Sequence, residues 1–275
     1  MFLGAHVSIA GGFDKSLDRG AELGANVIMT FASSPRSLSH AAVPSEIIAK
    51  YLRNKKTSPI SLHFFHGVYL VNLASGSRDY LQASINSLIS YQQLAASIEG
   101  VGTIFHVGTC KGLKSADTIS QIVEAVNYVT DSSPKGLRLI LENSAGQAGS
   151  VGSDLAELGQ IISRVGDKSK IGACLDTQHL FAAGYDLKTA LDKFDRAVGL
   201  KNLSVIHLND SKTEFSSHVD RHANLGEGYI GIDNLRTFVQ DPRLKKIPII
   251  LEVPGDAQSG PRKRDVDSLR SLVDN

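Results

Sequence analysis

Runs of β-branched and aliphatic residues recur along the chain and alternate with segments whose apolar residues have helical spacing. Most runs are continuous and apolar, which is typical of parallel strands buried on both faces. They predict strands at residues 3–8, 26–32, 59–65, 102–108, 137–143, 171–177, 203–210 and 247–253. The segments between them predict helices at residues 14–24, 45–56, 77–98, 115–130, 153–165, 186–198, 231–240 and 262–273. Ser45, Ser153 and Asp186 are the candidate N-caps, because their side chains can accept a hydrogen bond from the first helical turn.

This strict alternation of strands and helices predicts an α/β fold, a single (β/α)8 TIM barrel. A doubly wound open sheet is the structural alternative, but no GxGxxG turn follows the first predicted strand. The sequence shows no internal repeat, linker or low-complexity segment. We therefore expect one domain over residues 1–275.

Metal-type ligands stand where the predicted strands end. The carboxyl ends of the strands in a TIM barrel meet on one face, which brings such side chains together. Zinc and similar ions bind imidazole nitrogen and carboxylate oxygen, and buried carboxylates need a compensating cation or donor. The pattern predicts a polynuclear metal site at the C-terminal face of the strands. Its candidate ligands are His66, His106, Glu142, Asp176, His179, His207, Asp220, His222 and Glu252.

The remaining histidines serve as internal controls, because a lone histidine is more often a hydrogen-bonded core or surface residue than a ligand. His40 and His218 fall in polar loops, where we expect exposure to solvent. His63 lies before a strand end and His6 lies within the first strand. We assign none of the four to a metal, and we place His6 as a candidate lining residue of the pocket.

The ligand set favours phosphodiester hydrolysis over acyl transfer. Five histidines and four carboxylates exceed the needs of one mononuclear site and supply two or three ions if a carboxylate bridges. Two cations about 3.5–4 Å apart stabilise the attacking and leaving oxygens of a phosphoryl displacement. The sequence contains neither a GxSxG nucleophile elbow nor a Walker A loop.

Composition limits the partners and the compartment. The formal net charge is +1, so any nucleic acid must be bound through a local basic surface. The two cysteines form no CxxC pair, and Cys174 is predicted to be a buried small hydrophobic residue. No signal peptide and no apolar run of about 20 residues is visible. We expect an intracellular monomer that contacts no membrane, cytoplasmic in a prokaryote or nuclear in a eukaryote.

Several long stretches identify a resemblance. They include GAHVSIAGG at residues 4–12, FHVGTCKG, CLDTQHLFAAGYDL, HVDRHANLGEGYIG and IILEVPG at residues 249–255. With these stretches the chain resembles the endonuclease IV family of apurinic/apyrimidinic (AP) endonucleases over almost its whole length. The resemblance implies a TIM-barrel DNA-repair enzyme with three zinc ions. Such an enzyme hydrolyses the phosphodiester 5′ to an abasic site in duplex DNA and leaves a 3′-hydroxyl.

The same resemblance implies how the ligands are divided. One zinc takes His66, His106 and Glu142; a second shares Glu142 and takes Asp176, His207 and Glu252; the third takes His179, Asp220 and His222. A hydroxide bridging the first two ions is the implied nucleophile. Glu142, Glu252 and His222 are the implied catalytic residues, which act through these metals.

The resemblance also implies DNA contacts by Arg36, Tyr69 and Leu70, with the last two filling the hole that an abasic site leaves in the base stack. The loop at residues 33–39 is smaller and has fewer polar amide side chains than is usual in the family. Two alternatives stay open. One is a metal-dependent sugar isomerase or epimerase on the same barrel, which needs one or two ions. The other is a non-catalytic DNA-damage binding protein.

Overall fold

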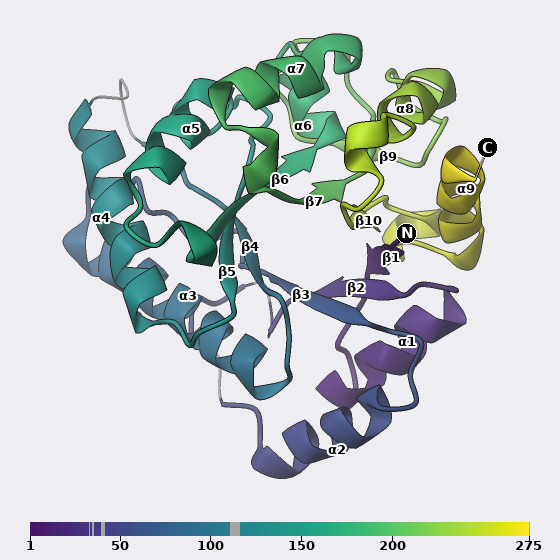
Figure 1. Cartoon of the computed structure of the whole chain (residues 1–275), viewed down its shortest axis with the longest axis horizontal. Helices are drawn as coiled ribbons and strands as arrows, with labels where there is room; N and C mark the ends of the chain where they lie inside the picture. The colour runs from purple at the N-terminus through teal and green to yellow at the C-terminus, as the bar shows by residue number, and fades with distance from the viewer. Residues whose placement is uncertain (33, 35, 40–41, 111–115, 275) are drawn as a thin grey trace.

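The computed structural model describes residues 1–32, 34, 36–39, 42–110 and 116–274. Within them, parallel strands close into a barrel in the order β1-β10-β7-β6-β5-β4-β3-β2, which confirms the predicted TIM barrel. Figure 1 looks into this ring of strands, with the helices packed around its outside. The strands are β1 Leu3–His6, β2 Val27–Thr30, β3 Leu62–His66, β4 Gly102–His106, β5 Arg138–Glu142, β6 Ile171–Asp176, β7 Leu203–His207 and β10 Ile249–Leu251.

Alternate side chains of the strands form two separate cores. A small cluster takes residues from seven of the strands, including Phe64, Ile104 and Cys174, and fills the barrel interior. A larger cluster lies between the strands and the helices and contains their neighbours, such as Phe65 and Phe105. Cys174 is fully buried, as predicted. Two-sided burial explains why the strand sequences are continuously apolar.

Each of the predicted helices is present. They are α1 Ser16–Glu22, α2 Ser45–Lys55, α3 Arg78–Ser97, α4 Ala116–Ser132, α5 Leu155–Arg164, α7 Leu187–Ala197, α8 Ile232–Val239 and α9 Lys263–Val273. The structure adds a short helix that was not predicted, α6 Thr177–Ala182, directly after β6. Among the described residues, no helix is both long and apolar enough to span a bilayer. Short 3-10 turns lie at Phe13–Lys15, Lys168–Lys170, Leu200–Asn202, Pro242–Leu244 and Asp256–Gln258.

One of the three N-cap predictions is confirmed. The Asp186 side chain accepts a hydrogen bond from Lys188 N and caps α7. The Ser153 prediction is wrong by one position, because Asp154 caps α5 instead. The Ser45 prediction is also wrong, because Ser45 is already the first helical residue and Pro44 occupies the cap position.

The connection between β7 and α8 contains a further hairpin. β8 (Asp210–Ser211) and β9 (His222–Ala223) pair antiparallel, with Asp210 opposite Ala223 and Ser211 opposite His222. The predicted strand at 203–210 is therefore two strands, β7 and the start of β8. This hairpin brings residues 220–222 of the long connection back toward the barrel.

Candidate metal centre

The nine candidate ligands meet at the C-terminal face of the barrel. Five are the last residues of consecutive strands β3 to β7: His66, His106, Glu142, Asp176 and His207. The other four follow or flank strands: Glu252 comes after β10, His179 lies in α6, Asp220 precedes β9, and His222 begins β9. Because the strands are parallel and closed into a barrel, residues far apart in sequence converge on one space.

Glu142 lies at the middle of this group and is fully buried. Four imidazole nitrogens surround its carboxylate: His207 Nδ1 at 2.8 Å, His66 Nε2 at 3.0 Å, His179 Nδ1 at 3.5 Å and His106 Nε2 at 3.6 Å. Burial would raise the pKa of Glu142, but charge on His106 and His207 and hydrogen bonds from imidazoles hold it well below its usual range. The carboxylate therefore stays ionised, as a metal ligand must.

Three of the histidines are oriented by backbone carbonyls. The Nδ1 atoms of His66, His179 and His222 donate to the carbonyls of Gly67, Asn143 and Glu252 at 2.7, 3.0 and 3.2 Å. Their Nε2 atoms consequently face the carboxylates. This arrangement, with one ring nitrogen fixed and the other directed at a shared space, is the usual orientation of metal-binding histidines.

The donor atoms fall into overlapping groups that fit metal ions. In each group the nearest ligand atoms lie within 4.8 Å of one another. The groups are His66, Glu142 and His207; Glu142, Asp176, His207 and Glu252; Asp176, His179 and His222; and His106, His179 and Asp220. His106 therefore lies close enough to His179 and Asp220 to hold an ion with them, and it also lies near Glu142.

Buried imidazole nitrogens at this site lack a hydrogen-bond partner. The Nε2 atoms of His179 and His222 make no hydrogen bond to the part of the chain that the structure describes, although each faces the Asp220 carboxylate, at 3.2 and 3.4 Å. These nitrogens face a carboxylate without forming a hydrogen bond to it, an arrangement that a cation shared with the carboxylate would stabilise. Burial lowers the pKa of His179, but Asp176 and Asp220 outweigh burial and raise it to about 10.

A cavity of about 550 Å³ opens above the ligands and has further residues on its wall. Lys212 and Arg221 line it, and sequence reasoning singled out neither. Lys212 N donates to the Arg221 carbonyl at 2.9 Å, which continues the β8–β9 pairing and places both cations at one edge. In the sequence HVDRH, Arg221 lies between the candidate ligands Asp220 and His222. This position is a signal that could have identified it as a residue of the site.

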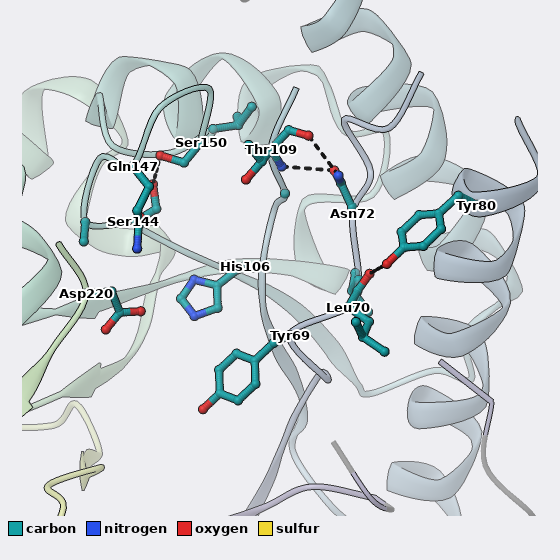
Figure 2. A pocket seen from close by; sticks show the side chains of 14 residues that line it. Tyr69, Leu70, Asn72, Tyr80, His106, Thr109, Ser144, Gln147, Ser150 and Asp220 are labelled. Carbon is teal, nitrogen blue, oxygen red and sulfur yellow. Dashed lines mark hydrogen bonds between the residues drawn. The ribbon is translucent and has the colours of Figure 1, made fainter. Parts of the chain in front are cut away.

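The candidate DNA-contacting residues lie on loops, and two of them lie beside this cavity. Tyr69 and Leu70 follow β3 and keep 65% and 38% of their surfaces exposed. They border a neighbouring pocket of about 380 Å³ that His106 and Asp220 also line (Figure 2). Arg36 is exposed in the turn after β2, and residues 33 and 35 of the same loop lie outside the described residues.

The control histidines have separate environments. His6 lines a pocket beside the centre, as expected, and its Nδ1 lies 3.2 Å from Glu252 Oε1. His63 is buried and hydrogen-bonded to Thr30 and Tyr51, away from the ligands. His218 is exposed. His40 lies outside the described residues.

Known proteins resemble this chain over nearly its whole length. Residues 17–272 match the family model of the xylose isomerase-like TIM barrel. A probable endonuclease 4 from Halothermothrix orenii is 38% identical, and the match covers 99% of each chain. The crystal structure of endonuclease IV from Thermus thermophilus superposes with a TM-score of 0.86 at 31% identity, covering 99% of this chain and 97% of that one. A D-tagatose 3-epimerase-like protein, with a TM-score of 0.76 and 17% identity over 98% and 96% of the chains, shares the fold alone. The chain therefore belongs to the xylose isomerase-like TIM-barrel family and, within it, to the endonuclease 4 family.

Proposed function

We propose that the protein is a zinc-dependent DNA-repair endonuclease that hydrolyses the phosphodiester 5′ to abasic sites in duplex DNA and leaves a 3′-hydroxyl. The observation that carries the proposal is the convergence of nine histidine and carboxylate ligands under an open cavity. Relatives named endonuclease 4 or endonuclease IV match nearly the whole chain. Both the chemistry of the ligands and the family support a hydrolase acting on DNA.

Three zinc ions would fit the ligand groups. The group of Glu142, Asp176, His207 and Glu252 would hold one ion. His66 and His106, which both approach Glu142, would hold another with it, and His179, Asp220 and His222 would hold the third. Bound zinc would supply positive charge beside the phosphate and lower the pKa of the attacking water. Glu142 would help to hold two of the ions, because imidazoles approach both of its oxygens.

The residues around the cavity suit a DNA strand with a missing base. Lys212 and Arg221 place positive charge next to the ligands, where they would bind phosphate oxygens. Tyr69 and Leu70 expose apolar surface at the cavity edge and would fill the gap in the base stack. Arg36 is exposed and would contact the backbone from the neighbouring loop.

The alternative functions are less well supported. A sugar epimerase on this barrel needs one or two ions and gives no role to Asp220 and the two imidazoles that face it, those of His179 and His222. The epimerase-like structure is 17% identical, so it supports the fold and not the activity. A binding protein without catalysis gives no reason to keep a full ligand set oriented by backbone carbonyls.

Incision of a defined duplex tests the proposal. The substrate is an end-labelled oligonucleotide with one reduced abasic analogue, which cannot be cleaved by β-elimination. We expect one cut 5′ to the lesion and a 3′-hydroxyl product. His222→Asn should lower the incision rate by more than about 100-fold, because loss of a ligand should exceed the 10–100-fold effect typical of outer-shell changes.

The matched control is His218→Asn, in the same connection but exposed. Asparagine tolerates the left-handed backbone conformation of His218, whose φ is 55°. This variant should cut at the wild-type rate. An uncut duplex with zinc-loaded wild-type protein would rule out the nuclease and favour the sugar epimerase.

A further inference from the structure

Asp210 is a fully buried carboxylate that accepts hydrogen bonds from a set of backbone N–H groups. Its Oδ1 accepts from Ser211, Ile230 and Gly231 at 2.7, 2.9 and 3.3 Å, and its Oδ2 accepts from Gly226 and Gly228 at 3.0 and 3.1 Å. Among the described residues, no lysine or arginine forms an ion pair with it. Backbone amides therefore compensate this buried carboxylate, and the proposed chemistry gives it no role.

The loop at residues 224–231 is shaped around this carboxylate. Gly226 and Gly231 have φ angles of 80° and 79°, which residues with a side chain rarely adopt. A Cβ atom at Gly228 would lie 2.5 Å from Asp210 Oδ1, so only glycine allows this approach. Successive amides turned toward one point form an anion-binding concavity. Here the bound anion is a side chain of the same chain.

The same residue begins the hairpin that carries His222. Asp210 pairs with Ala223, and Ser211 pairs with His222. A two-stranded hairpin with so few pairs is marginal without outside support. The carboxylate supplies that support, because it fixes the loop that directly follows β9. A second tie runs from Gly255 N to Asn224 Oδ1, at 2.9 Å, in the segment after Glu252.

We propose that Asp210 is a positioning residue for the third metal group. Its carboxylate holds residues 222–231 in place and thereby sets where the His222 imidazole stands relative to His179 and Asp220. It contacts neither DNA nor metal. The part of this proposal that concerns metal rests on the proposed function, whereas the part that concerns the loop does not.

Asp210→Asn is the test variant, because asparagine has nearly the same shape but turns an amide N–H toward the backbone donors. The matched control is Asp233→Asn, an exposed aspartate in the first turn of α8. Hydrogen exchange should show that amides of residues 224–231 lose protection by about tenfold or more in Asp210→Asn only. Unchanged protection there, or an equal loss across the whole chain, would overturn the proposal.

Metal content gives a second readout that a general structural defect would not produce. After dialysis against a graded zinc buffer, Asp210→Asn should bind one zinc equivalent about 10–100-fold more weakly and the others normally. Excess zinc should then restore its incision activity, which it should not do for His222→Asn. Equal zinc affinity in Asp210→Asn and wild type would refute the positioning role.

The outcomes separate this inference from the proposed function. A wild-type protein that binds zinc but leaves abasic DNA uncut contradicts the nuclease alone, and the zinc affinities of the variants still decide the role of Asp210. A wild-type protein that binds no zinc overturns the metal part of both proposals. Hydrogen exchange then decides whether Asp210 holds the loop.

Discussion

His63 is a histidine that the fold keeps neutral. Its Nε2 lies 2.9 Å from Thr30 Oγ1, and its Nδ1 lies 2.8 Å from the Tyr51 hydroxyl. Burial, with a smaller contribution from the charge on Lys55, lowers the pKa of His63 to about 3. Both ring nitrogens already have neutral partners, so protonation would place a charge in the core without a counterion.

This histidine makes the fold sensitive to acid. The unfolded chain binds the proton near pH 6.5 and the folded one near pH 3, so stability is lost as the pH falls between these values. Between pH 7.5 and 4.5 the loss from this group is about 3 kcal/mol. His63→Gln should therefore show a pH dependence of its unfolding free energy that is smaller by about that amount.

Urea unfolding at the two pH values measures the difference. We expect His63→Gln to lower the unfolding free energy at pH 7.5, because it disturbs the hydrogen bonds to Thr30 and Tyr51. The prediction is therefore tested by the difference in unfolding free energy between the two pH values, not by its value at either one. His218→Asn, at an exposed position, should keep the wild-type pH dependence. An equally steep dependence in His63→Gln would show that another group controls acid unfolding.

Some residues of the metal centre are easier to predict from the sequence than others. His66, His106 and Glu142 were predicted because each ends an apolar strand, and strand ends converge by geometry alone. The sequence around His222 is polar and does not resemble a strand, so only the surrounding motif marked it as a ligand, although it begins β9. Asp210 was not recognised, because its partners are backbone amides of a loop whose path the sequence does not reveal.

At the scale of elements, the start of α5 gives a direct comparison of two neighbouring residues. Asp154 Oδ1 accepts from Ala156 N at 2.9 Å, whereas Ser153 stands one position too early to cap. Asp154→Ala should lower the unfolding free energy by about 1 kcal/mol, the usual value of an N-cap. Ser153→Ala should change it by much less. Urea titration of both variants measures this, and equal losses would contradict the assignment.

The helix α6 shows why some elements escape prediction. It is six residues long and follows β6 directly, so its sequence is too short to show a helical period of apolar residues. Asp176 ends the strand and begins the helix, since its Oδ1 accepts from His179 N at 2.9 Å. Its Oδ2 accepts from Asn209 and faces His222. One carboxylate therefore caps a helix and serves the centre, a double role that no local pattern reveals.

At the scale of the whole molecule, DNA binding depends more on where charges lie on the surface than on the net charge. With a formal net charge of +1, DNA binding must depend on cations gathered at the barrel mouth. Each phosphate contact contributes about −0.9 to the slope of log affinity against log salt concentration. Arg36→Gln and Lys212→Gln should each weaken binding of abasic duplex and reduce that slope by about 1.

Fluorescence anisotropy over a range of salt concentrations measures the slope. Lys201→Gln is the control, because Lys201 is exposed just before β7, at the opposite end of the barrel. It should leave both affinity and slope unchanged. If Arg36→Gln binds like wild type, Arg36 has no role in DNA binding.

The closure of the barrel has a consequence for the order in which the protein is made. β1 pairs with β10 (Figure 1). The side chains of His6 and Glu252 meet across a separation of 246 residues. The ribosome releases the chain from its N-terminus, so the ligands on β3 to β7 emerge well before Glu252. Until β10 docks against β1, the ring of strands stays open and the ligand set lacks a member. A nascent chain would thus carry most of the ligands while unable to cut DNA, and activity would begin only after Glu252 has emerged and β10 has docked.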